Sequence, residues 1–192
     1  MKKVFIVHGF MSSPNGGFRP WLMAELYKHE VYACALPMPD PYNPKKEAWV
    51  QAISNAVNTF TEDEIVLVGH SLGVPAILRY LETRKENQKI GGAVLISGPC
   101  SLLDIDNKES KLRRIDNFLD TPFNFEDIKQ KSKNFVVIHG DNDPKVPFSH
   151  AEELSKNLNC KLISIPNGKH LGNSDGCHEL PEALEGINEM LK

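Results

Sequence analysis

Six short runs of continuous apolar residues divide the chain, and they limit its possible folds more than any other feature. The runs are rich in β-branched residues and lack polar alternation, which is typical of strands covered on both faces. They are VFIV (residues 4–7), VYACAL (31–36), IVLVG (65–69), AVLIS (93–97), FVVIH (135–139) and KLISI (161–165). Such a set predicts a mainly parallel, buried β-sheet.

Amphipathic stretches of helical length lie between the runs. In residues 72–85 the apolar positions Ile77, Tyr80 and Leu81 follow the three-four spacing of a helix face. The remaining stretches cover residues 19–29, 44–60, 149–158 and 180–191. Strands and helices that alternate in this order predict an α/β fold, with helices on both faces of the sheet.

Two segments interrupt this alternation. PMPDPYNP (residues 37–44) carries four prolines in eight residues and predicts a stiff, extended loop after the second strand. Residues 100–133 are too long for a tight connection and predict a short helical, lid-like insertion over one end of the sheet. With no linker or internal repeat, residues 1–192 are expected to form a single domain around one core.

Charge and cysteine content exclude several classes of protein. A net charge of −3 and a pI near 6.2 give no reason to expect a nucleic acid or an anionic membrane as partner. The four cysteines are far apart and form no CxxC pair, which argues against a zinc knuckle or a disulfide framework. The first apolar run is too short for a signal peptide or a membrane span, so we expect a cytoplasmic protein.

A candidate nucleophile follows the third run. In an open parallel sheet, ligands bind beyond the carboxyl ends of the strands. There the chain matches G-x-S-x-G with Gly69, His70, Ser71, Leu72 and Gly73. Between a strand and a helix this pattern predicts a sharp turn that exposes a strained serine, with glycines where strand and helix approach closely. We therefore predict that Ser71 is a nucleophile.

A serine nucleophile needs a base, and the best candidate is His170. In α/β hydrolases the chain order is serine, acid, histidine, each on a loop after a strand, and His170 lies five residues beyond the last run. Five other histidines belong to the glycine or serine motif, end a strand, or lie in or near a predicted helix: His8, His70, His139, His150 and His178.

The acid must come from FVVIHGDNDPKVPF (residues 135–148), which offers Asp141 and Asp143. An aspartate beside the strand end tends to bond local backbone in its turn. A later one can reach across to the far nitrogen of His170, where it fixes the tautomer and stabilises the imidazolium. The pattern favours Asp143, with Asp141 as the alternative.

An oxyanion site needs two backbone donors. The residue after the nucleophile, Leu72, supplies one N–H. The second is expected from the loop after the first strand, which has the sequence His8-Gly9-Phe10, and specifically from the N–H of Phe10.

Two further groups of residues are weaker candidates. Phe10, Trp21 and Trp49 could line an apolar acyl pocket near residues 37–44, with burial in the core as the alternative. Asp175, Cys177, His178 and Glu179 are metal-type ligands, but no second cluster at ligand spacing accompanies them. We therefore expect no metal and no cofactor.

With these residues in view, the chain resembles the small serine hydrolases of the α/β-hydrolase superfamily, specifically the YdeN-like or retinoblastoma-binding-protein-nine-like family. The resemblance implies a six- or seven-stranded hydrolase sheet with a minimal lid. It places the acid three residues before the Val-Pro valine, at Asp143, and leaves Asp141 as a turn residue. The family histidine commonly follows two glycines, whereas here Lys169 replaces the second. The matching segments are FIVHGF, LPMPDPYNPKKEAW, LVGHSLGVPAILRYLE, DNDPKVPF and GKHLGNSDG.

These features predict a cofactor-independent serine hydrolase that cleaves a carboxylic ester or related acyl bond in a small to medium substrate. A thioesterase or an aminoacyl-ester hydrolase would use the same groups. The alternative is a protein-binding module that has kept a hydrolase fold. The presence of serine, acid, histidine and both oxyanion loops argues against it, because a binding module needs none of them.

Overall fold

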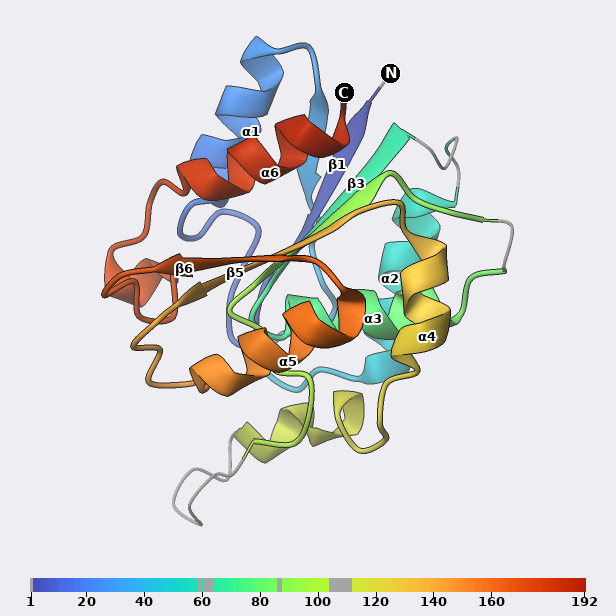
Figure 1. The fold of residues 1–192 in the computed structure, drawn as a ribbon, viewed down its shortest axis with the longest axis vertical. Helices are drawn as coiled ribbons and strands as arrows, with labels where there is room; N and C mark the ends of the chain where they lie inside the picture. Colours follow the sequence, from blue (N-terminus) through green and yellow to red (C-terminus); the bar gives the residue numbers. More distant parts are fainter. Residues whose placement is uncertain (1, 59, 61–63, 86–87, 104–111) are drawn as a thin grey trace.

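The computed structural model describes residues 2–58, 60, 64–85, 88–103 and 112–192. Six parallel strands form one sheet in the order β2-β1-β3-β4-β5-β6 (Figure 1). The strands are β1 (Lys3–Val7), β2 (Tyr32–Ala35), β3 (Ile65–His70), β4 (Gly92–Ile96), β5 (Phe135–Gly140) and β6 (Lys161–Ile165). Each predicted apolar run therefore forms a strand, and the predicted α/β-hydrolase architecture is confirmed.

Helices cover both faces of the sheet, as the continuous apolar runs require. α1 and α6 pack on one face, while α2, α3 and α5 pack on the other (Figure 1). Alternate residues of a strand point to opposite faces of the sheet. In β1, Phe5 and Val7 pack toward α2 and α3, whereas Val4 and Ile6 pack toward α1 and α6. The helices are α1 (Arg19–Lys28), α2 (Lys46–Val57), α3 (Gly73–Glu82), α4 (Phe125–Ile128), α5 (Phe148–Leu158) and α6 (Pro181–Met190).

The strand order determines where a ligand can bind. From β1 the chain moves to β2 on one side, and it then crosses back to place β3 on the other side of β1. The connections that follow β1 and β3 therefore leave on opposite faces of the sheet. A crevice opens at such a switch point, beyond the carboxyl ends of the strands. The loop after β1 and the turn after β3 meet there.

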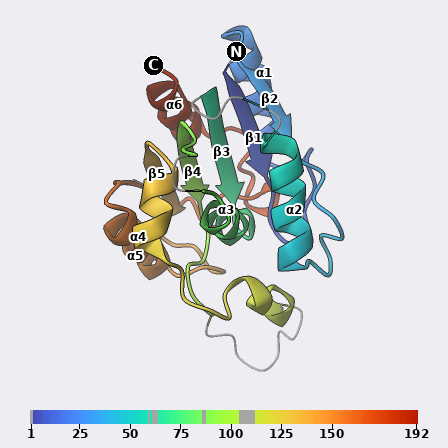
Figure 2. The ribbon, with the colours of Figure 1, turned by 90° about the vertical axis from the view of Figure 1, so that its right-hand side faces the viewer.

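The predicted insertion at residues 100–133 is described except for residues 104–111, which lie outside the described part. It contains α4 and two 3₁₀ segments, η2 (Leu112–Phe118) and η3 (Lys129–Lys131). η2 lies beyond the carboxyl ends of the strands (Figure 2). There Nε of Arg79 donates to the carbonyl of Phe118 at 2.9 Å, and Nη1 of Arg114 donates to that of Tyr42 at 2.9 Å. The segment thus touches α3 and the proline-rich loop, and a lid role stays a prediction.

Candidate active site

The turn between β3 and α3 holds Ser71 in a strained conformation. Its φ is +55°, in the left-handed region that most side chains avoid. Two glycines permit the turn. A Cβ on Gly69 would lie 2.8 Å from the backbone carbonyl carbon of Gly73, and one on Gly73 would collide with the carbonyl oxygen of Val7. This is the local geometry that the G-x-S-x-G pattern predicts.

Ser71, His170 and Asp143 form a continuous hydrogen-bonded chain. Nε2 of His170 lies 2.9 Å from Oγ of Ser71, and Nδ1 lies 2.7 Å from Oδ2 of Asp143. Because an ionised carboxylate can only accept, Nδ1 carries the hydrogen and the Nε2 lone pair faces the serine hydroxyl. The Asp143 side chain is 0% exposed, so water does not compete for its bonds.

The Asp143 carboxylate is held by four donors. Oδ1 accepts the backbone N–H groups of Lys145 at 2.8 Å and Val146 at 3.1 Å. Oδ2 accepts from His170 and from Nε2 of His139, which lies 3.3 Å away. Burial acts to raise the pKa of Asp143, but the hydrogen bonds from His139, His170 and Lys145 outweigh it and lower the pKa below its ordinary value. The carboxylate is therefore ionised across the neutral range.

His139 at the end of β5 has a contact that the sequence did not reveal. The Nε2 of this fully buried side chain faces two acceptors, Oδ2 of Asp143 and the carbonyl oxygen of Val146 at 3.0 Å. It must therefore carry the hydrogen and donate to both. The strand-end position alone indicated a buried structural histidine. Its link to Asp143 depends on how residues 140–147 fold back over the strand.

Three successive side chains tie the acid loop to the histidine loop. Asp141 accepts the N–H of Asn167 through Oδ1 at 2.8 Å, and Asn142 accepts the N–H of Lys169 at 2.8 Å. Asp143 then bonds His170 itself. The expectation that Asp141 only bonds its own turn was wrong, because its partner lies in the loop after β6.

The histidine loop has an unusual backbone. Asn167, Lys169 and Leu171 have φ values of +54°, +53° and +52°. A glycine adopts such angles without a steric penalty, which accounts for the glycine that the resemblance implies at Lys169. A buried side chain from the end of β3 also holds this loop. Nε2 of His70 lies 2.9 Å from the carbonyl oxygen of His170 and donates to it. Burial, with the nearby His170, lowers the pKa of His70 well below its usual value, so His70 is neutral.

The loop after β1 lies directly against the serine. A Cβ on Gly9 would lie 2.9 Å from Cβ of Ser71 and 3.3 Å from its Oγ. The backbone N–H groups of Phe10 and Leu72 donate to no other backbone group in the part of the chain that the structure describes. Leu72 also precedes the first turn of α3, where the helix dipole favours negative charge. Both predicted oxyanion donors are thus available.

Arg19 and His8 support this loop. Nε of Arg19 donates to the carbonyl of Ser13 at 3.1 Å, and Nη2 donates to Oγ of Ser12 at 2.9 Å. Burial lowers the pKa of Arg19 to about 10. Nδ1 of His8 lies 2.9 Å from the carbonyl oxygen of Gly9. Burial lowers the pKa of His8, although this hydrogen bond acts in the opposite direction.

The three candidate pocket residues are not brought together. Trp49 is 0% exposed and donates its Nε1–H to the carbonyl of Pro39 at 2.7 Å, so it anchors the proline-rich loop to α2. Phe10 is half-buried against the same apolar cluster as Trp49. Trp21 packs on the opposite face of the sheet, among residues of α1 and α6. Of the three, only Phe10 adjoins Ser71 through its loop.

The metal-type ligands near residue 177 do not converge. Cys177 directs its sulfur at the carbonyl of Glu179 at 3.5 Å, and Asp175 accepts the N–H of Gly172 at 3.1 Å. In the described part of the chain, one group of three such side chains has its ligand atoms within 4.8 Å of one another. It consists of Cys100, His150 and Glu153. No sequence pattern indicated this group, because Cys100 lies 50 residues before His150 along the chain.

The parallel sheet, the strained serine and its hydrogen-bonded histidine define an α/β hydrolase. The chain belongs to the serine hydrolase family, whose model matches residues 4–189. It is 34% identical over 180 residues to the ydeN gene product of Bacillus subtilis (strain 168), covering 94% of this chain and 91% of that protein.

Two further comparisons agree with this family. The crystal structure of the ydeN product superposes with a TM-score of 0.91 at 32% identity, covering 99% of this chain and 98% of that one. The serine hydrolase RBBP9 of Rattus norvegicus is 25% identical over 172 residues, covering 89% of this chain and 86% of that protein. No helix among the described residues has the length and apolar character needed to cross a membrane.

Proposed function

We propose that this serine hydrolase cleaves carboxylic esters or related acyl bonds through a triad of Ser71, His170 and Asp143. The observation that supports this most is the unbroken chain of 2.9 Å and 2.7 Å contacts from the serine hydroxyl through the imidazole to a buried carboxylate. A free serine hydroxyl is a poor nucleophile at neutral pH, and such a chain activates it.

In the first half of the reaction, Ser71 Oγ attacks the acyl carbon while Nε2 of His170 takes its proton. Asp143 stabilises the resulting imidazolium through Nδ1–H. The negative charge on the acyl oxygen is held by the N–H groups of Phe10 and Leu72, which have no other backbone acceptor in the described chain. The imidazolium then protonates the departing alcohol, and the acyl group stays on Ser71.

In the second half, a water molecule enters beside His170. Its proton moves to Nε2 as its oxygen attacks the acyl-enzyme, and the same two N–H groups hold the second oxyanion. Collapse of this intermediate returns the proton from His170 to Oγ of Ser71 and releases the carboxylic acid. The cycle uses only protein groups and water, and it applies equally to thioesters and aminoacyl esters.

A panel of p-nitrophenyl esters with graded acyl lengths tests this proposal, together with one acyl thioester and one aminoacyl ester. We expect hydrolysis well above the rate of the Ser71→Ala variant, with preference for short to medium acyl chains. If wild-type protein with intact secondary structure hydrolyses no member of the panel faster than that variant, the proposed activity is wrong.

Activity is expected to rise with pH to a plateau in a single step, because the general base must be neutral to accept the serine proton. The lowered pKa of Asp143 keeps its carboxylate ionised, and the lowered pKa of His70 keeps that ring neutral. Neither group adds a second step between about pH 5 and 8. Measurement of kcat/KM across this range checks the expectation, and two rising steps would contradict it.

His139 is expected to act as a positioning residue for Asp143. His139→Leu removes the N–H that lies 3.3 Å from the carboxylate. We expect kcat to fall about 10- to 100-fold, which corresponds to the usual free-energy contribution of a hydrogen bond to a charged group. KM should change little, because His139 is not placed to touch substrate. His139→Gln retains an N–H donor and should recover most of kcat. Equal losses in both variants, or a change confined to thermal stability, would show that the contact is only structural.

A further inference from the structure

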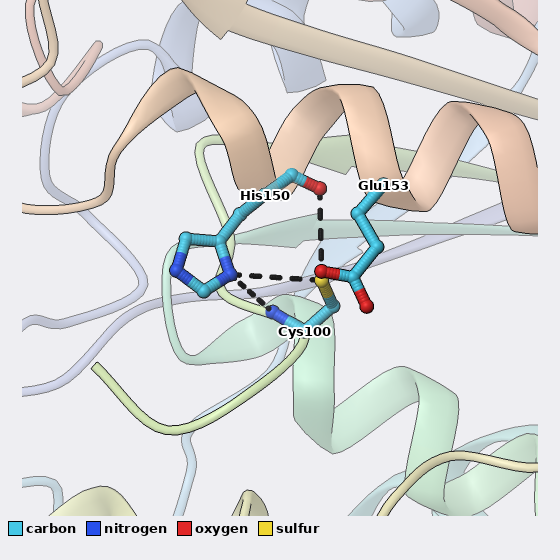
Figure 3. A group of neighbouring side chains, drawn as sticks. All are labelled: Cys100, His150 and Glu153. Atoms are coloured by element: carbon cyan, nitrogen blue, oxygen red, sulfur yellow. Dashed lines mark hydrogen bonds between the residues drawn. The ribbon is translucent and has the colours of Figure 1, made fainter. Parts of the chain in front are cut away.

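Three potential ligand groups converge between the loop after β4 and the first turns of α5 (Figure 3). Cys100 lies four residues beyond the end of β4, while His150 and Glu153 are three residues apart on one face of α5. Their ligand atoms all lie within 4.8 Å of one another. Cys100 is 5% exposed and His150 is 8% exposed, whereas Glu153 is at the surface. The group is therefore buried on one side and reachable from the other.

The imidazole is in the state that a metal ligand requires. The backbone N–H of Cys100 donates to Nδ1 of His150 at 3.3 Å, so this nitrogen carries a lone pair rather than a hydrogen. The same nitrogen lies 3.6 Å from the sulfur of Cys100. Burial is the main cause that lowers the pKa of His150. The charge of Glu153 acts to raise this pKa, whereas His139 acts to lower it further. The lowered pKa keeps the His150 ring neutral.

The sulfur is surrounded by acceptors. Besides Nδ1 of His150, the carbonyl oxygen of His150 lies 3.6 Å from Sγ of Cys100, and the Glu153 carboxylate faces it (Figure 3). One S–H can satisfy only one of these groups. The thiol hydrogen of Cys100 therefore lies where several acceptor lone pairs converge. A divalent cation can replace that proton and bind all three side chains.

The spacing suits zinc. Zinc–sulfur and zinc–nitrogen bonds of about 2.3 and 2.0–2.1 Å at a tetrahedral angle put the two ligand atoms about 3.5–3.6 Å apart. The sulfur and nitrogen of Cys100 and His150 are 3.6 Å apart. Charge also balances, because a thiolate and a carboxylate together neutralise a divalent cation, which lowers the cost of burying it.

We propose that Cys100, His150 and Glu153 bind a zinc-like divalent cation, with Sγ, Nδ1 and a carboxylate oxygen as ligands and a fourth position open to water. Binding forms three bonds to the cation and breaks the S–H bond of Cys100, whose proton passes to solvent. It also replaces the hydrogen bond that the backbone N–H of Cys100 donates to Nδ1 of His150. The bound cation ties the loop after β4 to the helix that follows the acid loop. The site uses neither Ser71 nor His170, so it is separate from the proposed hydrolase activity.

Titration of metal-stripped protein with Co²⁺ tests the site, because cobalt occupies zinc sites and gives a thiolate-to-metal absorption band. We expect one equivalent to bind with this band and Zn²⁺ to displace it stoichiometrically. Because one proton leaves, affinity should rise about tenfold per pH unit over the range where the free thiol is protonated. Ser71→Ala should titrate like the wild type, whatever the outcome of the activity assays.

Three variants locate the binding. Cys100→Ser should lose the thiolate band, and Glu153→Gln, a substitution at the surface, should weaken cobalt binding at least about tenfold. Cys177→Ser is the matched control, since it removes a thiol beside the other acidic group, Asp175 and Glu179, and should leave the titration unchanged. The proposal is overturned if wild-type protein shows no thiolate band, or if Cys177→Ser abolishes the band while Cys100→Ser retains it.

Discussion

Replacement of Ser71 by alanine is expected to reduce turnover of an activated ester by about a millionfold, as loss of the nucleophile does in serine proteases. Alanine removes only Oγ, the atom that lies 2.9 Å from Nε2 of His170, and leaves no group that can form the acyl-enzyme. The residual rate should reflect only binding and the oxyanion donors. Steady-state kinetics on one p-nitrophenyl ester from the panel measures the change.

The fold of the Ser71→Ala variant should be retained, because alanine removes only Oγ and has the same Cβ strain as serine at φ +55°. Circular dichroism and thermal unfolding provide this control. A folded variant that keeps more than about a hundredth of wild-type turnover would contradict the role proposed for Ser71, because any other route lacks the covalent step.

Replacement of Asp143 by asparagine is expected to lower turnover a thousandfold or more, about 4 kcal/mol of transition-state stabilisation. The amide can donate to Nδ1 of His170, which favours the wrong tautomer and moves the hydrogen to the nitrogen that faces Ser71. It also removes the charge that stabilises the imidazolium. Kinetics on the same activated ester measures the loss, with KM expected to change far less than kcat.

Asp141→Asn is the matched control, two residues away on the same loop. Asp141 uses Oδ1 to accept the N–H of Asn167, and the asparagine oxygen can accept the same bond. Turnover should therefore fall less than about tenfold, with the remaining cost in thermal stability. If Asp141→Asn proves more damaging than Asp143→Asn, the proposed acid is the wrong aspartate.

Much of the fold was predictable because its signals are local. Strands β1, β3, β4 and β5 are buried along their whole length, and this burial produces the continuous apolar runs in the sequence. Exposure rises in β2 and β6, which lie at the edges of the sheet. No apolar run predicts the order of the strands in the sheet, because that order depends on which strands pair with each other.

The candidate site likewise has features that the sequence predicts locally and features that depend on contacts between distant segments. The turn at Ser71 and the position of His170 follow from patterns within a few residues. The support given by His139, and the bonds of Asp141 and Asn142 to the histidine loop, depend on contacts between segments 7 to 27 residues apart. The spacing of apolar residues in the sequence does not indicate such contacts. For the same reason the sequence could not place Trp21 and Trp49 on opposite faces of the sheet.

Covalent labelling by a fluorophosphonate tests the central claim most directly, because this probe reacts with a serine only when a neighbouring base activates it. Native protein is treated with the probe, digested, and analysed by mass spectrometry to find the modified residue. We predict one adduct per chain, on Ser71, and none in the Ser71→Ala variant or in heat-unfolded wild type. An adduct on another residue, labelling that persists in Ser71→Ala, or no labelling of folded wild-type protein would contradict the claim.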